Sequence, residues 1–138
     1  MIDAENAVFN TVSSALKMTY SGIYVTGEYT PAPPRFPAVS LMESDNRVAT
    51  KYSSSSTIER AVSTMYEANI YSNKVSGKKT EAKAIANALD EVMAGLGFTR
   101  TMRNQIPNFN DAKIYRIVCR YEGTIIPNDD GKYYIHTK

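Results

Sequence analysis

The chain has 138 residues, of which 43% are hydrophobic and 22% are charged, and its 16 basic and 14 acidic side chains leave a net charge of +2. These values are close to the globular average, so they exclude wholesale disorder and a fibrous repeat, and we expect one domain over residues 1–138. The small net charge disfavours a dedicated nucleic-acid binder. No apolar run is long enough to cross a membrane and the first residues lack signal-peptide features, so we expect a cytoplasmic protein without a membrane partner.

The first 37 residues predict a helix, a strand and a stiff loop. Apolar residues recur at helical spacing from Asp3 to about Lys17, and Asp3 can cap the first turn. β-branched and aromatic residues then predict a strand over 23–29. Four prolines between 31 and 37 break regular structure, because each lacks an amide donor and favours extended geometry before it.

The middle of the chain predicts two strands separated by a polar loop. A short strand is expected over 38–43, and turn chemistry at Ser44-Asp45-Asn46 opens a serine-rich loop over 44–57. Residues 58–73 alternate as a long strand does, and Tyr71 on the second face indicates that this face is partly covered. The face expected to be buried carries Val62, Thr64, Tyr66, Ala68 and Ile70.

The C-terminal half predicts a second helix and three more strands. The helix is expected to begin at Thr80 as its N-cap and to end at Gly95 and Gly97. Strands are expected over 98–106, 114–125 and 133–137. Helices separated by runs of strands with short turns predict an α+β domain, with a mostly antiparallel or mixed sheet and two helices packed on one face.

Residues that could support catalysis or bind a metal are scarce. Cys119, the only cysteine, lies in an apolar and aromatic run that predicts a buried strand. His136, the only histidine, lies two residues from the C-terminus, and we expect no catalytic or metal-binding role for it. The pairs Asp90–Glu91 and Asp129–Asp130 favour solvated and turn roles, and Gly95–Gly97 follows a helix, where it cannot cradle a phosphate. The sequence therefore predicts a protein that is not an enzyme and uses no metal or cofactor.

Local positive charge and many tyrosines are the other notable features. The basic side chains are Lys78, Lys79, Lys83, Arg100 and Arg103. They could face DNA in a channel, although a solvated helix face is the simpler interpretation. The chain has 10 tyrosines and no tryptophan, and tyrosine suits interfaces because it combines a large contact area with a polar tip.

Two stretches of the C-terminal half carry a resemblance to a known family. Residues 66–98 combine a strand ending in EANIYSNK, a Gly-Lys-Lys turn and the helix EAKAIANALDEVMAGL, followed by GFTR. Residues 106–123, IPNFNDAKIYRIVCRYEG, lead from a proline turn into an aromatic strand with alternating arginines. This succession resembles the tail terminator and tail completion proteins of long-tailed bacteriophages. The N-terminal helix followed by a proline-rich segment ending in FPAVSL is similar too.

The resemblance implies a structural virion protein. Such a subunit forms a ring, usually a hexamer, at the head-proximal end of the tail tube, where it ends tube polymerisation and joins the tail to the head. The implied partners are further copies of the chain, the tail tube protein and the head connector or stopper, with DNA only as passing cargo. We then expect assembly in the cytoplasm of the bacterial host and a final location in the virion.

Contacts in such a ring are expected from segments that the core does not need. These segments are 31–37, 44–57 and 127–138. The individual interface candidates are Pro33, Pro34, Phe36, Asn46, Tyr52, Tyr71, Tyr133 and Tyr134. Arg100 and Arg103 are the candidates for side chains that face the lumen of the ring.

Two alternatives stay open at this point. The chain could be a head-side adaptor or stopper ring of the neck, because the sequence does not separate neighbouring ring layers. It could also be a small nucleic-acid-binding or regulatory module, for which the basic turn at 77–83 is the main support. A closed ring and salt-dependent DNA binding by a monomer are the observations that distinguish a ring protein from a nucleic-acid binder.

Overall fold

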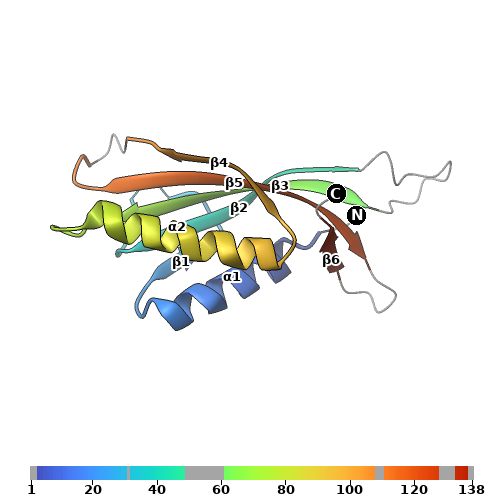
Figure 1. Ribbon diagram of the computed structural model, residues 1–138, viewed down its shortest axis with the longest axis horizontal. Helices are drawn as coiled ribbons and strands as arrows, with labels where there is room; N and C mark the ends of the chain where they lie inside the picture. The colour runs from blue at the N-terminus through green and yellow to red at the C-terminus, as the bar shows by residue number, and fades with distance from the viewer. Residues whose placement is uncertain (1–2, 31, 49–60, 108–110, 128–132, 137–138) are drawn as a thin grey trace.

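A computed structural model describes residues 3–30, 32–48, 61–107, 111–127 and 133–136, which form two helices and one sheet. In chain order the elements are α1 (Glu5–Thr19), β1 (Tyr24–Thr26), β2 (Ala38–Val48), β3 (Val62–Ser72), α2 (Lys78–Gly95), β4 (Thr99–Gln105), β5 (Tyr115–Pro127) and β6 (Tyr133–His136). Both helices lie along one side of the sheet (Figure 1). The predicted α+β class is therefore confirmed.

The sheet follows the order β1-β2-β3-β5-β4, with β6 beside β5. Strand β1 is parallel to β2, and every other described pairing is antiparallel. Strand β4 pairs with β5 over 117–122 and β6 pairs with it over 124–127, so the two follow one another along the same side of β5. No helix in the described ranges is both long and apolar enough to cross a membrane.

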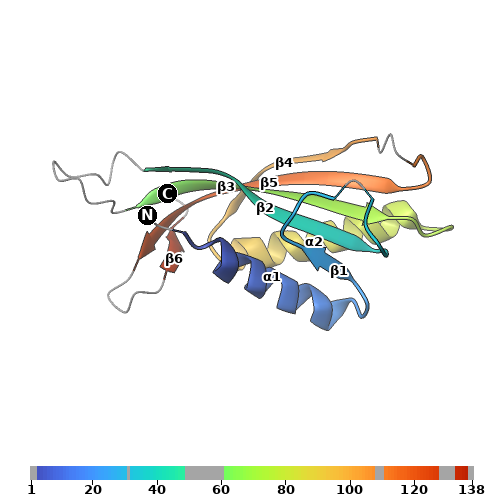
Figure 2. The same ribbon diagram turned by 180° about the vertical axis from the view of Figure 1, so that it is seen from behind.

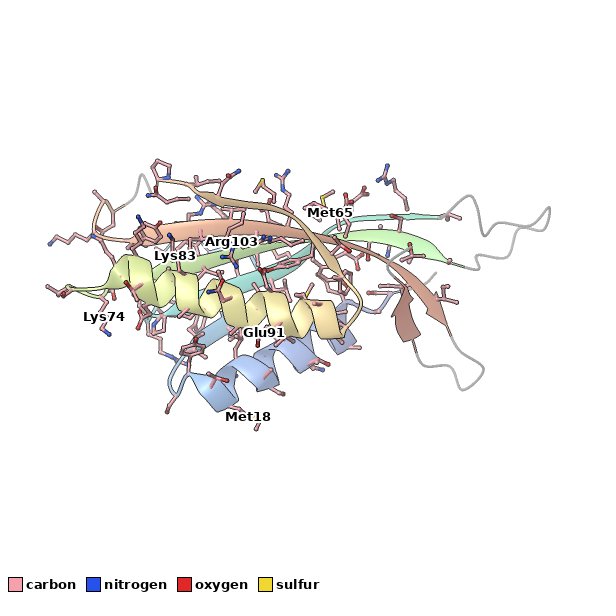
Figure 3. The ribbon with its side chains drawn as sticks, in the orientation of Figure 1. Met18, Met65, Lys74, Lys83, Glu91 and Arg103 are labelled. Atoms are coloured by element: carbon pink, nitrogen blue, oxygen red, sulfur yellow. The ribbon has the colours of Figure 1, made fainter. Side chains whose placement is uncertain are left out.

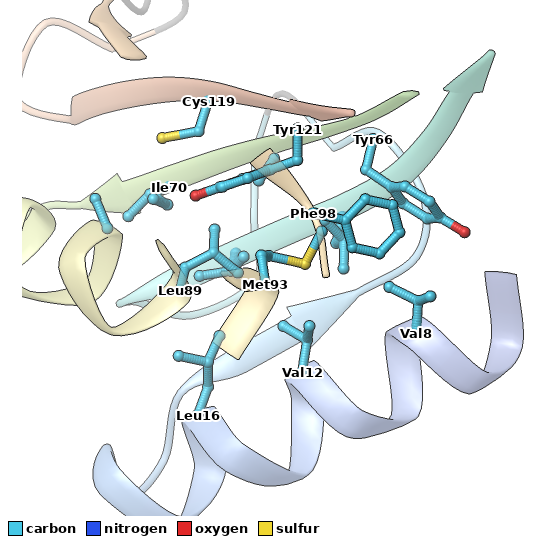
Figure 4. Close-up of a cluster of buried hydrophobic side chains, with 14 of the residues drawn as sticks. Val8, Val12, Leu16, Tyr66, Ile70, Leu89, Met93, Phe98, Cys119 and Tyr121 are labelled. Carbon is cyan, nitrogen blue, oxygen red and sulfur yellow. The ribbon is translucent and has the colours of Figure 1, made fainter. Parts of the chain in front are cut away.

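The hydrophobic core fills the space between the helices and the sheet face that they cover (Figure 4). Tyr66 meets Phe98 edge-on there, with the ring centroids 5.1 Å apart. The helices contribute the apolar stripes predicted from their spacing, with the buried side chains Val8, Val12, Leu16, Ile85, Leu89 and Met93. Burying these side chains drives the docking of both helices, at roughly 1.5–3 kcal/mol for each large one.

The alternation predicted for the two central strands is confirmed. The expected inner face of β3 is buried throughout, at Val62, Thr64, Tyr66, Ala68 and Ile70. Strand β5 likewise buries Ile117, Cys119 and Tyr121. The opposite face carries an ion pair between Glu67 and Arg120, with 3.1 Å between Oε1 and Nε.

The expected turn at Ser44-Asp45-Asn46 is wrong, because β2 continues through it to Val48. The register against β3 shifts between Glu43 and Asp45, which indicates a β-bulge that accommodates the extra residue. The Ser44 hydroxyl donates to the Met65 carbonyl at 3.2 Å, so a turn-forming side chain supports the bulged strand. The remainder of the predicted serine-rich loop, from residue 49, lies outside the described residues.

Two predicted helix starts also differ from the structure. Helix α2 begins at Lys78, before the expected cap Thr80, because Gly77 reverses the chain at a φ of 89°, which favours glycine. At α1 the N-cap position is Ala4, and Asp3 accepts a hydrogen bond from the Glu5 amide at 3.1 Å from one residue further out.

Candidate functional site

Two of the predicted interface residues, Pro33 and Tyr71, are buried inside the subunit, and Tyr71 is only 1% exposed. The reason is the parallel pairing of β1 with β2, because the chain between parallel neighbours must return across a face of the sheet. That connection crosses the face opposite the helices (Figure 2). Pro33 and Tyr71 are therefore corrected from contact residues to packing residues.

The covered part of this opposite face is polar. The Arg116 guanidinium donates to Asn69 Oδ1 from Nε at 2.9 Å and from Nη2 at 2.7 Å. Its guanidinium carbon also lies 5.9 Å from the centroid of the Tyr71 ring. Burial raises the pKa of the Tyr71 hydroxyl. The Tyr71 hydroxyl has no hydrogen-bond partner within the described part of the chain, which is unusual for a buried polar atom.

Phenylalanine substitutions should have different effects on stability at Tyr66, Tyr71 and Tyr121, the tyrosines that are buried in the described part of the chain. Tyr66 and Tyr121 donate to the carboxylates of Glu43 and Asp90, so removing either hydroxyl should lower the free energy of unfolding by about 1–3 kcal/mol. Tyr71→Phe removes an unpaired hydroxyl and should change stability by less than about 0.5 kcal/mol or raise it. Urea unfolding followed by circular dichroism measures all three variants. Equal losses in the three would contradict the hydrogen-bond assignment.

The other interface candidates lie at the surface or outside the residues that the structure describes. Pro34 is exposed, Phe36 is partly exposed, and Asn46 lies partly exposed in the outer half of β2. The Asn46 amide donates to the Glu43 carboxylate at 3.0 Å. Tyr52 lies outside the described residues, and for Tyr133 and Tyr134 the structure describes the backbone of β6 alone.

The two lumen candidates, Arg100 and Arg103, lie on the side of β4 that faces α2, since both contact Asp90 of that helix. Figure 3 shows Arg103 beside α2. Simple alternation places them on opposite faces, but the register against β5 shifts between Arg100 and Met102 and brings both to the same face. There both donate to Asp90 Oδ2, from Arg100 Nη1 at 3.0 Å and from Arg103 Nη2 at 2.8 Å. Both arginines therefore form ion pairs that hold α2 against β4.

Asp90 has a structural role that the sequence does not predict. Besides the two arginines, its Oδ1 accepts a hydrogen bond from the Tyr121 hydroxyl of β5. Burial, followed by this hydrogen bond, raises the pKa of Tyr121, so the phenol stays protonated and donates at all ordinary pH values. The interpretation of Asp90 as a solvated helix residue is wrong, because one side chain links α2 to β4 and β5. No local pattern around Asp90 signals this role.

A second carboxylate cluster joins α1 to β2. Glu5 Oε2 accepts from the Glu43 amide at 2.9 Å, and the Glu43 carboxylate accepts from the Tyr66 hydroxyl at 3.0 Å. Burial raises the pKa of the Glu43 carboxyl, while its hydrogen bonds from Asn46 and Tyr66 oppose the increase. Beside this cluster a cavity of about 360 Å³ opens between α1, the end of β1 and β2, lined by Glu5, Asn6, Phe9, Thr26, Gly27, Glu28 and Leu41.

The raised pKa of Glu43 predicts a pH effect on stability. The folded state binds the proton more tightly than the unfolded chain, so the contribution of Glu43 to stability rises as the pH falls through its folded-state pKa. This rise is complete below the ordinary glutamate value, where both states are protonated. Wild type should therefore gain stability relative to Glu43→Gln on acidification within that window. Urea unfolding of both proteins from pH 7 to pH 4 measures the difference, and parallel curves would contradict the effect.

Groups with reactive chemistry are few in the described part of the chain. Cys119 is fully buried in β5, as predicted, and burial raises the pKa of its thiol, which disfavours the nucleophilic thiolate. His136 pairs with Thr124 through the β6–β5 ladder, so its backbone belongs to the sheet. Among the residues described, no three His, Cys, Asp or Glu side chains form a cluster that could hold a metal ion.

Comparison of the sequence with protein-family models and with curated proteins finds no match. The features that bear on function are the surfaces of this chain and the resemblance carried by residues 66–98 and 106–123. The candidate contact surfaces are the outer half of β2, the cavity beside α1 and the charged turn before α2.

Proposed function

We propose that this chain is a structural protein of a long-tailed bacteriophage particle. It forms a ring, with six copies as the expected number, at the head-proximal end of the tail tube. There it ends tube polymerisation and joins the tail to the head connector or stopper. The resemblance to tail terminators supports the place of the ring, and the shape of the subunit supports its mode of assembly.

The observation that carries the proposal is that the sheet extends beyond its helical cover. The 13 residues of β5 span roughly 43 Å at about 3.3 Å per residue, whereas the 18 residues of α2 span roughly 27 Å. The ends of the β2–β3 and β5–β6 pairs project past both helices (Figures 1 and 2). Such arms offer contact surface that the subunit's own core does not use.

The outer edge of β2 is the part of this arm best suited to a partner. Strand β1 pairs only with the first part of β2, from Ala38 to Ser40. The Glu43 amide further along is occupied by Glu5. From Ser44 to Val48 no described strand lies on that side, and unpaired strand edges accept strands from other chains.

The mechanism would be geometric. A ring requires head-to-tail contacts between different surfaces of identical subunits, with a rotation that closes. A closed ring seated on the last layer of tube subunits covers their exposed edges, so no further layer adds. The opposite side of the ring then presents a fresh surface to the head connector. DNA passes through the lumen without specific contacts.

Electron microscopy and mass measurement of the purified protein, with and without tail tubes, test this function. We expect closed rings, either free or formed on tube ends. Rings that bind head connectors and ignore tubes would place the protein on the head side of the neck as an adaptor or stopper. A chain that stays monomeric in every mixture would contradict the ring.

One observation favours a second candidate, a small nucleic-acid-binding module. Lys74, Lys78 and Lys113 lie together around the turn before α2, and no ion pair involves them within the described residues. Binding of duplex DNA by the monomer that weakens steeply with salt would support this candidate.

A further inference from the structure

A basic corner, defined here as Lys74, Val75, Lys78 and Lys113, lies where β3 turns into α2. Val75 is fully exposed at the tip of this turn, which is unusual for an aliphatic side chain. Lys78 Nζ donates to the Lys113 carbonyl at 3.3 Å, which links the start of α2 to the segment before β5. Figure 3 shows Lys74 at one end of the molecule, beyond the start of α2. The corner therefore presents an apolar tip surrounded by positive charge.

The cavity beside α1 has the complementary character. The partly exposed Phe9 is its accessible apolar side chain, with the buried Leu41 at its base, and its acidic residues are Glu5 and Glu28. No ion pair involves Glu28 within the described ranges. One carboxylate oxygen of Glu5 accepts a hydrogen bond from the Glu43 amide, and a carboxylate can accept further hydrogen bonds. The volume of about 360 Å³ leaves space for side chains from outside the subunit.

One subunit cannot join these two surfaces to each other. Figure 1 shows the start of α1 and the start of α2 at opposite ends of the helical layer, because the two helices run in opposite directions. Two complementary surfaces that lie apart on one subunit are what a head-to-tail contact requires, and such contacts close into rings when the rotation between neighbours permits.

We propose that the basic corner of one copy docks into the α1 cavity of the next copy. Val75 enters against the partly exposed Phe9, while Lys74 and neighbouring lysines approach the carboxylates of Glu5 and Glu28. The inference rests on the ring proposed above and names one contact that builds it. Burial of the valine supplies apolar area, and the charge pairs fix the register and disfavour other docking modes.

Charge reversal tests this contact. Lys74→Glu and Glu28→Lys each place like charges opposite one another, so each should weaken ring formation by at least about tenfold in dissociation constant. The double variant restores opposite charges and should recover rings, as should a mixture of the two single variants. Lys83→Glu is the matched control, because this exposed lysine of α2 lies outside the corner and the variant has the same net charge as Lys74→Glu. Sedimentation velocity and native mass spectrometry read out the assembly, and circular dichroism confirms the fold.

Each outcome decides between the two proposals. Loss of rings in both single variants with recovery in the double variant supports the contact. Wild-type rings in Lys74→Glu and Glu28→Lys overturn the contact and leave the ring intact, as does a failure of the double variant to recover. A wild-type chain that stays monomeric with and without tubes overturns both. Salt-dependent binding of duplex DNA by that monomer, lost in Lys74→Glu, would assign the corner to nucleic acid instead.

Discussion

Replacing Asp90 by alanine should lower the free energy of unfolding by about 2–4 kcal/mol, although Asp90 lies on a helix and is partly exposed. The loss has two sources. The Tyr121 hydroxyl is left buried without its acceptor, and the guanidinium of Arg103, whose side chain is only 24% exposed, loses its charged partner. Urea unfolding at pH 7 measures the change.

Two matched variants give this prediction its control. The Asn87 side chain accepts from Arg103 Nη1 at 3.0 Å on the exposed side of the same helix, so Asn87→Ala should cost less than about 0.5 kcal/mol. Arg100 is more exposed than Arg103, at 43%, and Arg100→Ala should cost about 0–1 kcal/mol. If Asp90→Ala were no worse than Asn87→Ala, Asp90 would not be the link between α2 and the sheet.

Leu16→Ala should cost about 2–5 kcal/mol, because the side chain is buried between α1 and the rest of the core. Met18, two residues along the same helix, is 89% exposed, and Met18→Ala should change stability by less than about 0.5 kcal/mol. Both substitutions introduce alanine, the residue with the highest helix propensity, so the difference between them reports packing alone. Similar losses in the two variants would contradict the observed orientation of α1.

The sequence predicts the central part of this fold well, because local pattern and tertiary environment agree there. Strands β3 and β5 are paired on both sides and their helix-facing side is buried, so the alternation from Val62 to Ala68 reflects the actual packing. The apolar stripes of both helices are reliable for the same reason. The prediction is less accurate toward the edges of the sheet. Ser44-Asp45-Asn46 has turn chemistry, but pairing with β3 holds these residues in a bulged strand.

The surface residues are harder to predict, because their exposure depends on pairings that no local pattern encodes. Pro33 and Tyr71 were expected at the surface, and the parallel β1–β2 pairing buries them. Arg100 and Arg103 were expected to point into a lumen, and a bulge in β4 brings both to Asp90. The sequence predicts the basic turn between β3 and α2, but no local pattern predicts the acidic cavity beside α1.

The length of tails on particles that lack this polypeptide tests the central claim most directly. If the chain caps the tail tube, its removal should give tubes of uncontrolled length that are not fastened to filled heads. Supplying the wild-type protein during assembly should restore uniform tails attached to heads. Particles that lack the protein and still carry tails of normal length, firmly joined to filled heads, would contradict the account.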